Sequence, residues 1–308
     1  MTRLIFAFLA VIFLTAPANA QEQLNGLPPR AAPTAHVQVD TLPVMDATPK
    51  FDAARATAAY LARIGGTARA RSDAYFEGGY WLMLVDLIWA LAVAGLLLWL
   101  RISVWLRDWI AERTHSRTLQ AIFYGAAYVV LTTAATFPLT VYEGYVREHA
   151  YGLSNQNFTA WFGDFAIGLV ITLMAAVIFV PLLYAAIRRA GGSWWLWGAG
   201  LVIAFQIVTA VIYPLFIAPL FNTYTPLAEG PLKAQILSLA RANDIPADNV
   251  WMMDASRQSN RVSANVSGFL GTTRITLNDN LLKQGSPDEV LAVLGHEMGH
   301  YVMGHILR

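Results

Sequence analysis

Four long apolar runs constrain the fold of this chain more than any other feature of its sequence. They lie at residues 81–100, 119–141, 165–187 and 194–220. Each is long enough to cross about 30 Å of hydrocarbon, which takes about 20 helical residues. The chain is 56% hydrophobic and 13% charged, with a mean hydropathy of +0.46, and this composition excludes an ordinary soluble domain. The sequence therefore predicts a mainly α-helical polytopic membrane protein.

Polar and aromatic residues refine this prediction. Tryptophans crowd the ends of the runs, as they do where membrane helices meet the headgroups, so the lipid bilayer is an expected partner. Asp86 lies within the first run and needs either a wet, protein-lined environment or a position close enough to the interface to be hydrated. The net charge of +1 gives no indication of a nucleic-acid partner. We expect a transmembrane domain of four spans over residues 71–220.

The N-terminal residues have a different character. Residues 1–20 combine a basic start, an apolar stretch and the small-residue end Ala18-Asn19-Ala20, which is typical of a secretory signal peptide. An uncleaved N-terminal anchor is the alternative. Residues 21–70 are expected to form an exported linker rich in Pro and Ala, followed by a short Ala-rich helix near 52–70. The chain has no cysteine, so a metal site must use His and carboxylate ligands.

The distribution of arginines bears on the orientation in the membrane. Turns are expected near 101–118, 143–163 and 188–193, and arginines are concentrated in the first and third of them. The positive-inside rule places these two turns in the cytoplasm and the C-terminal domain outside, in a multi-pass protein of a bacterial inner membrane. Arginines at 63, 69 and 71 oppose this arrangement, so the orientation of the C-terminal domain stays open.

Residues 221–308 change in composition and predict a small α+β domain, which we name the C-terminal domain. Its expected elements are an amphipathic helix at 231–243, a strand at 250–253, and strands at 262–270 and 273–277 joined by a hairpin. A last helix has its own start signal. Ser286-Pro287-Asp288-Glu289 supplies an N-cap serine, a proline at the first helical position and a glutamate three residues after the cap.

This last helix carries the pattern His-Glu-x-x-His. At about 100° per residue, His296 and His300 lie about 40° apart on one helix face, where two imidazoles can bind one zinc ion. Glu297 can then act as general base. Two structural histidines on an amphipathic helix are the alternative. His305 lies nine residues after His296, about 180° round an unbroken helix, and is expected to point away from the metal.

Several ordered segments resemble a known family, the type I CAAX prenyl endoproteases, which are integral-membrane zinc metalloproteases. The resemblance begins near residue 72 and runs to the end of the chain, and the metal helix matches closely. The matching segments are 72–81, 148–156, 218–227, 254–257, 273–282 and 291–300. Several segments in the same order are far more specific than the metal motif alone.

The resemblance implies a helical barrel around a water-filled chamber, with the zinc site facing inward. It gives zinc binding to His296 and His300 and the general-base role to Glu297. The family's third zinc ligand is a glutamate on a later helix, beyond Arg308 in this sequence. We therefore expect the zinc metalloprotease domain at 221–308 to be incomplete, and the chain to be inactive or weakly active alone.

The strand before the metal helix is expected to bind substrate. Val262-Ser263-Ala264 stands where eukaryotic members typically show Ser-Asn-Ala, and Asn265 follows two positions after Ser263. This strand is expected to pair with an extended peptide, with Ser263, Ala264 and Asn265 as the substrate-binding residues. Ordinary strand positions without a binding role are the alternative for Ser263 and Asn265. Glu148 and His149, in another matching segment, are either chamber-lining polar groups or interfacial loop residues.

The sequence thus predicts a membrane-embedded zinc metalloendopeptidase that hydrolyses peptide bonds in a peptide or protein substrate, with or without a lipid group. A quality-control protease of the same zinc type, acting on misfolded membrane or exported proteins, is one alternative. A non-catalytic membrane scaffold or transporter with an incidental motif is another, and the intact motif in its capped helix argues against it.

Overall fold

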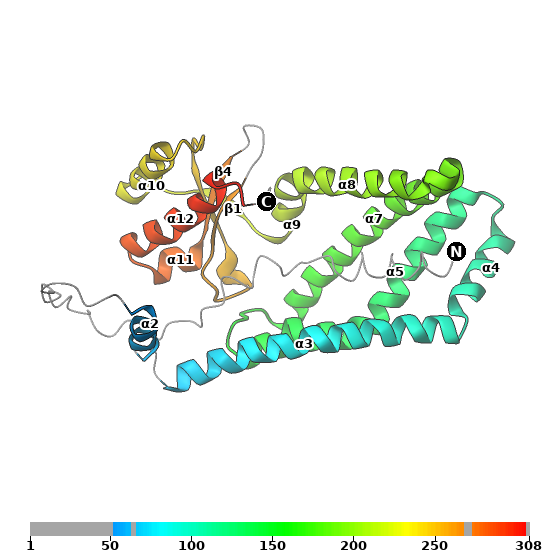
Figure 1. The fold of residues 1–308 in the computed structure, drawn as a ribbon, viewed down its shortest axis with the longest axis horizontal. Coiled ribbons are helices and arrows are strands. Elements are labelled where there is room, and N and C mark those ends of the chain that lie inside the picture. The colour runs from blue at the N-terminus through cyan, green and yellow to red at the C-terminus, as the bar shows by residue number, and fades with distance from the viewer. Residues whose placement is uncertain (1–51, 63–65, 268–272, 306–308) are drawn as a thin grey trace, which may run out of the picture.

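The computed structural model describes residues 52–62, 66–267 and 273–305, as a group of long helices beside a small domain of helices and strands (Figure 1). The signal peptide or anchor expected at 1–20 lies outside the described residues, as does the Pro- and Ala-rich linker that follows it. The predicted fold class, a mainly helical membrane protein with a small α+β domain, is confirmed.

The Ala-rich helix expected near 52–70 is divided. Helix α2 covers Ala53–Leu61, and α3 already begins at Gly66 and continues to Trp99. The first apolar run is therefore the second half of a helix of 34 residues.

The apolar runs all lie on helices. Three continuous helical stretches are long and apolar enough to cross a membrane, and the last of them turns at Gly191–Ser193 into two helices, α7 and α8. Each of the four predicted runs thus has a helix of its own. The helices that follow α3 are α4 (Ile102–Arg113), α5 (Arg117–Val141), α6 (Glu148–Ala150), α7 (Phe158–Ala190), α8 (Trp194–Ile212) and α9 (Ala218–Phe221).

The segment expected to be a turn at 101–118 is instead mostly helix α4, so that prediction was wrong. Its charged residues obscured an apolar pair, Leu106 and Ile110, which lie one helical turn apart and are both buried. The chain reverses only at Arg101, whose φ is 55°, and between α4 and the N-cap Ser116 of α5.

Two of the long helices pack closely because a glycine lies between them. A Cβ atom at Gly125 of α5 would lie 3.1 Å from Val180 of α7. Ala121 and Ala176 are buried in the same contact. Small residues let membrane helices approach one another, and here they fix α5 against α7.

Two helices end in π-helical segments, Tyr142–Arg147 after α5 and Tyr213–Ile217 after α8. The first continues through α6 into the loop before α7, where Asn155 donates to the Ser256 carbonyl of the C-terminal domain. The second continues through α9 into that domain (Figure 1).

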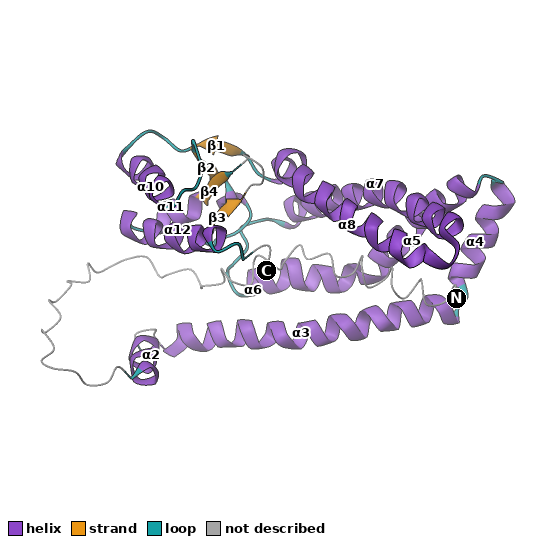
Figure 2. Cartoon of the chain, turned by 45° about the horizontal axis from the view of Figure 1, so that its top comes forward, coloured by secondary structure: helices purple, strands orange, loops and turns teal. Residues whose placement is uncertain are grey.

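The C-terminal domain contains a four-stranded sheet in the order β1-β2-β4-β3. Strands β2 and β4 run parallel, and the two outer pairs are antiparallel. Helices α10, α11 and α12 gather beside the sheet (Figure 2). The bounds are β1 Tyr224–Pro226, β2 Val250–Met253, β3 Ala264–Ser267, β4 Arg274–Asn278, α10 Pro231–Ala242, α11 Asp279–Gln284 and α12 Pro287–Val302.

These bounds confirm the amphipathic helix, the strand at 250–253 and the capped last helix. They also confirm antiparallel pairing of β3 with β4, although residues 268–272 between them lie outside the described part of the chain. One hydrophobic core joins the sheet to the helices, with Ile236 of α10, Ile275 of β4 and Leu294 of α12 each fully buried. This core holds α12 in place against the sheet.

Candidate metal centre

The start of α12 is fixed by its capping box. Ser286 Oγ accepts a hydrogen bond from the backbone N–H of Glu289, and the Glu289 carboxylate accepts one from the backbone N–H of Ser286 at 2.9 Å. These bonds satisfy two donors that would otherwise lack partners at the start of the helix. Once the first residue is fixed, every later residue of α12 has its place on a defined face.

The buried face of α12 is made by Val290, Leu294 and Met298, all 1% exposed or less. His296 is exposed and His300 is half-buried, so both lie off the core face. The helix therefore packs through one stripe and presents its two motif histidines elsewhere.

The two histidine rings converge. His296 Nε2 and His300 Nε2 lie 3.0 Å apart, and the ring centroids are 4.6 Å apart at an interplanar angle of 85°. Two Zn–N bonds of about 2.0–2.1 Å can span such a separation at a single ion. The pair therefore fits a zinc ion, through the nitrogen that each ring directs toward the other. Within the described residues, no group of three or more His, Cys, Asp or Glu side chains is gathered to hold a metal.

Glu297 follows His296 directly and is half-buried. A carboxylate at this point of the helix, next to a metal-binding histidine, can accept a proton from a water molecule at the metal. This is the arrangement that the motif predicts.

The chain reverses just after the motif, and this brings His305 back to it. Helix α12 ends at Val302, Gly304 has a φ of 63°, and the backbone N–H of His305 donates to the carbonyl of His300 at 3.2 Å. His305 Nδ1 then lies 2.8 Å from His300 Nδ1. The assumption of an unbroken helix was wrong, although His305 still lies on the side of His300 that faces away from His296. Gly304 was the available signal, since glycine commonly ends helices in the left-handed conformation.

The strand expected to bind substrate is an edge strand. β3 pairs with β4 and is the last strand of the sheet among the described residues, and it packs against α12. The backbone N–H of Asn278 donates to the carbonyl of Ser263 at 3.0 Å, so Ser263 directs its backbone toward β4. In an antiparallel pair alternate residues do this, and Asn265 therefore shares the orientation.

The backbone groups of Ala264 and Val266 consequently point to the outer edge of β3. Their side chains are buried in the core, while the Asn265 side chain lies on the opposite face of the sheet. The Asn265 Oδ1 atom is buried and has no hydrogen-bond donor among the described residues. Ser263, Ala264 and Asn265 thus lie together at the start of the edge strand, with the outward backbone groups on Ala264 and Val266.

The face of the sheet that carries Asn265 also carries Arg274, whose guanidinium contacts two aromatic rings. Arg274 lies over the rings of Tyr224 and Trp251, at 4.5 and 4.4 Å from their centroids. Burial lowers the pKa of Arg274 and raises the pKa of Tyr224. The stack ties three strands together through side chains on one face.

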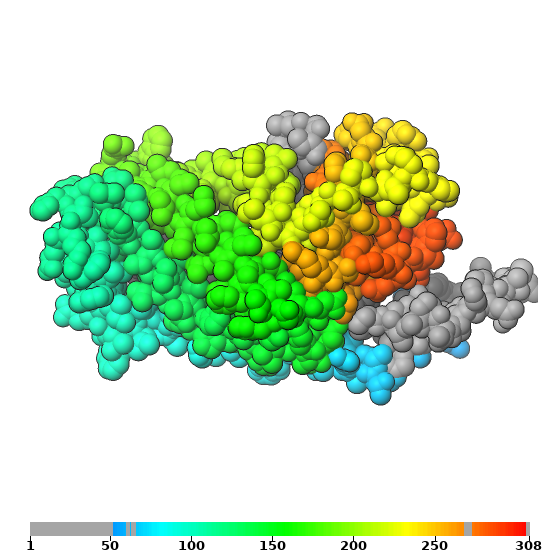
Figure 3. Space-filling model, turned by 180° about the vertical axis from the view of Figure 1, so that it is seen from behind, coloured from blue at the N-terminus to red at the C-terminus, as the bar shows by residue number. Residues whose placement is uncertain are grey.

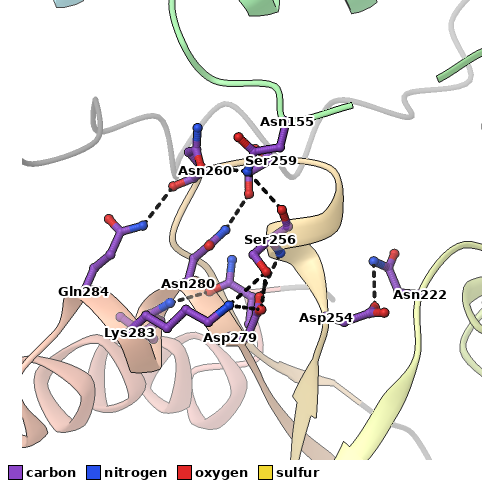
Figure 4. Close-up of polar contacts among 12 residues, drawn as sticks. Asn155, Asn222, Asp254, Ser256, Ser259, Asn260, Asp279, Asn280, Lys283 and Gln284 are labelled. Atoms are coloured by element: carbon purple, nitrogen blue, oxygen red, sulfur yellow. Dashed lines mark hydrogen bonds and ion pairs between the residues drawn. The ribbon is translucent and has the colours of Figure 1, made fainter. Parts of the chain in front are cut away.

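A polar network supports the loop between β2 and β3 (Figure 4). Asp279 at the start of α11 accepts hydrogen bonds from the Ser256 backbone N–H at 2.8 Å and from Lys283 Nζ at 2.7 Å. Burial alone raises the pKa of Asp279, but the bonds from Lys283 and Ser256 outweigh it and leave the pKa lowered. Asn155, from the loop before α7, donates to Asn260 at 2.7 Å and so joins the network to the membrane helices.

Sequence reasoning missed a buried ion pair between the two parts of the molecule. Arg261 Nη2 lies 2.8 Å from Glu148 Oε2, with side chains only 13% and 14% exposed. Tyr75 of α3 donates to Glu148 Oε1 at 2.8 Å. We name these three residues the junction triad. Figure 3 shows the helices and the C-terminal domain in contact on the face drawn, and Asn155 of the loop before α7 donates to the Ser256 carbonyl at 2.9 Å.

Of the two roles considered for Glu148 and His149, the structure places Glu148 in this junction. His149 lies between two backbone carbonyls, those of Tyr145 and Gln156, each 2.7 Å from one ring nitrogen. Both residues thus brace the loop that leads from α6 to α7.

Two family models match the chain. One, described as "CAAX prenyl protease N-terminal, five membrane helices", matches residues 59–223, more than half of the chain. The other, described as "Peptidase family M48", matches residues 226–308 and contains the whole motif.

Individual relatives agree with this. The uncharacterized metalloprotease YhfN of Bacillus subtilis is 34% identical over 205 residues, which are 67% of this chain and 48% of the relative. CAAX prenyl protease 1 of Saccharomyces cerevisiae is 32% identical over 198 residues, or 62% of this chain and 43% of the relative. The crystal structure of S. mikatae Ste24p matches with a TM-score of 0.67 at 27% identity, over 78% of this chain and 57% of that one.

The chain thus spans about half the length of the curated relatives that it matches. The membrane part and the C-terminal domain each match their own portion of one family, in the same order along the chain. The chain therefore belongs to the CAAX prenyl protease family, within peptidase family M48, and is a membrane protein.

Proposed function

We propose that this protein is a membrane-embedded, zinc-dependent metalloendopeptidase that hydrolyses peptide bonds. The observation that carries the proposal is the convergence of His296 Nε2 and His300 Nε2 at 3.0 Å, with Glu297 between them in the helix. The two motif histidines thus face each other, and neither Nε2 atom is directed at a separate hydrogen-bond partner elsewhere in the described part of the fold. This arrangement favours a metal-binding role over a structural one.

The residues divide the chemistry between them. His296 and His300 would hold the zinc ion, which when bound polarises the scissile carbonyl and lowers the pKa of water. Glu297 would take a proton from the attacking water and deliver it to the leaving amine. The buried stripe of α12 keeps this carboxylate in register with the two imidazoles, because the helix cannot rotate without exposing Leu294.

The substrate would lie along the outer edge of β3. An extended peptide there can exchange hydrogen bonds with the outward backbone groups of Ala264 and Val266, while Ser263 and Asn265 remain paired with β4. The binding segment is the one predicted from the sequence, but most of its hydrogen bonds to substrate would come from backbone atoms. Such bonds do not depend on the substrate's side chains, so peptides of many sequences could bind.

Two substrate classes are consistent with the fold. The name of the yeast relative favours prenylated proteins, whereas the predicted export signal and the departure from Ser-Asn-Ala at 262–264 favour misfolded membrane or exported proteins. In either case the long helices would form part of the chamber wall, and the protein would lie in a bacterial inner membrane. The comparison of cleavage of a farnesylated peptide with cleavage of an unfolded membrane protein separates the two classes.

The test of the chemistry is Glu297→Gln in the purified protein in detergent. We expect zinc to remain bound, because both histidines remain, and hydrolysis of both test substrates to fall by about 10²–10⁴-fold. Glu112→Gln, which alters an exposed glutamate of α4, is the matched control and should retain activity. Removal of zinc by a chelator should abolish cleavage, and added zinc should restore it. Measurable turnover in wild type that is unchanged in Glu297→Gln would refute the mechanism.

A further inference from the structure

We propose that His305 is a positioning residue for the metal centre, which orients the His300 ring through a hydrogen bond between the two Nδ1 atoms. The inference rests on the proposed function and deepens it. It concerns a residue outside the His-Glu-x-x-His motif, and the chain reversal after α12 is what brings it to the site.

The geometry gives the two nitrogens of His300 different partners. Its Nε2 lies 3.0 Å from His296 Nε2, on the side where a metal ion would bind, and its Nδ1 lies 2.8 Å from His305 Nδ1. The centroids of the His300 and His305 rings are 5.0 Å apart, at an interplanar angle of 64°. His305 therefore contacts the nitrogen that metal binding leaves available.

This contact selects a tautomer. A neutral imidazole carries its proton on one nitrogen, and the other nitrogen supplies the lone pair for a metal. If His305 Nδ1 accepts a hydrogen bond, the proton of His300 is held on Nδ1 and the lone pair remains on Nε2. Partners of this kind fix the ring orientation of metal-binding histidines, and their loss typically costs about 10–100-fold in metal affinity.

The backbone supports the same contact. Gly304 adopts a φ of 63°, a conformation that side chains disfavour, and a Cβ atom there would meet nothing within 4 Å. The reversal lets the backbone N–H of His305 donate to the carbonyl of His300 at 3.2 Å. His305 is thus tied to His300 by both backbone and side chain, so its ring has little freedom to move away.

The experiment is a cobalt titration of the purified 308-residue chain in detergent, in competition with a chromogenic chelator. Cobalt(II) replaces zinc as the probe because its visible spectrum reports the ligand geometry. We expect His305→Ala to weaken cobalt binding by about 10–100-fold and to alter the spectrum. His305→Asn should remain within about threefold of wild type, because the asparagine oxygen can replace Nδ1 as acceptor.

His305→Gln is the matched control, since its amide lies one bond further from the backbone and should not restore the contact. Gly304→Ala tests the reversal and should weaken cobalt binding in the same direction as His305→Ala. His296→Ala removes a proposed metal ligand, and its cobalt affinity shows how much binding is lost when a ligand is absent.

The outcomes separate the two proposals. Equal affinity in wild type and His305→Ala, with weaker binding in His296→Ala, would overturn the role of His305 and leave the proposed function intact. Absence of cobalt binding by wild type even at a large excess of cobalt over protein would overturn both. Restoration by asparagine but not by glutamine would support a hydrogen bond, whereas equal loss in all three His305 variants would overturn it.

Discussion

The membrane helices and the C-terminal domain use the same apolar residues in opposite ways. Leu87 and Leu98 of α3 are 56% and 55% exposed, and α3 has no buried residue at all, whereas Leu294 of α12 is fully buried. In the helices many apolar side chains are exposed, as expected where lipid or other helices cover them. In the C-terminal domain they must remove one another from water, which ties each helix to the sheet.

The comparison indicates which part of this protein is held rigid by packing. α5 and α7 touch through small residues, but much of the helical surface remains available to lipid or to other helices. The metal helix instead rests on a core shared by α10, α12 and three of the strands. The residues that need exact placement are therefore carried by the more densely packed part.

The largest expected effect comes from opening a cavity in that packed part. Leu294→Ala should lower the free energy of unfolding by about 2–5 kcal/mol, since the side chain is fully buried beneath the motif. Leu87→Ala, at an exposed position of α3, should cost less than about 1 kcal/mol. Thermal unfolding in detergent, followed by near-UV circular dichroism, compares the two. Equal destabilisation would contradict the contrast between the regions.

An intermediate effect is expected where the two regions meet. Glu148→Gln and Arg261→Gln should each destabilise the contact by about 1–3 kcal/mol, because each leaves a largely buried charge without its partner. The double variant should cost less than the sum of the singles. A double-mutant cycle measures this coupling, with Tyr75→Phe as the third member of the junction triad. Strict additivity would show that the pair contributes little to joining the regions.

The smallest effect concerns the pH dependence of the C-terminal domain. The pKa of Asp279 is lowered in the folded protein, so this residue contributes stability above its unfolded pKa of about 3.9, and the contribution is lost as the pH falls through the folded value. The thermal midpoint of wild type should therefore fall more steeply than that of Asp279→Asn when the pH is lowered from about 5 to 3. Asp248→Asn, at an exposed position, serves as the control. If the thermal midpoints of wild type and Asp279→Asn fall in parallel with pH, Asp279 does not contribute to the pH dependence of stability.

Much of the fold could be predicted because its signals are local. The capping box at Ser286 and the apolar stripe of α12 each depend on residues within a few positions of one another, and the structure confirms them. The apolar runs are local signals too, and the structure places them on three continuous helical stretches that are long enough to cross a membrane. Helix α4 was not predicted because only two of its apolar residues are buried, and these two lie among charged neighbours.

The sequence by itself determined the start of α12 and the pairing of His296 with His300, because two residues four positions apart on a helix lie on the same face. Only the tertiary structure decided the rest. His305 reaches His300 through a reversal at Gly304, and Tyr75 meets Glu148 and Arg261 across 73 and 186 residues of sequence. Such contacts depend on where whole helices and strands pack, so no local pattern specifies them.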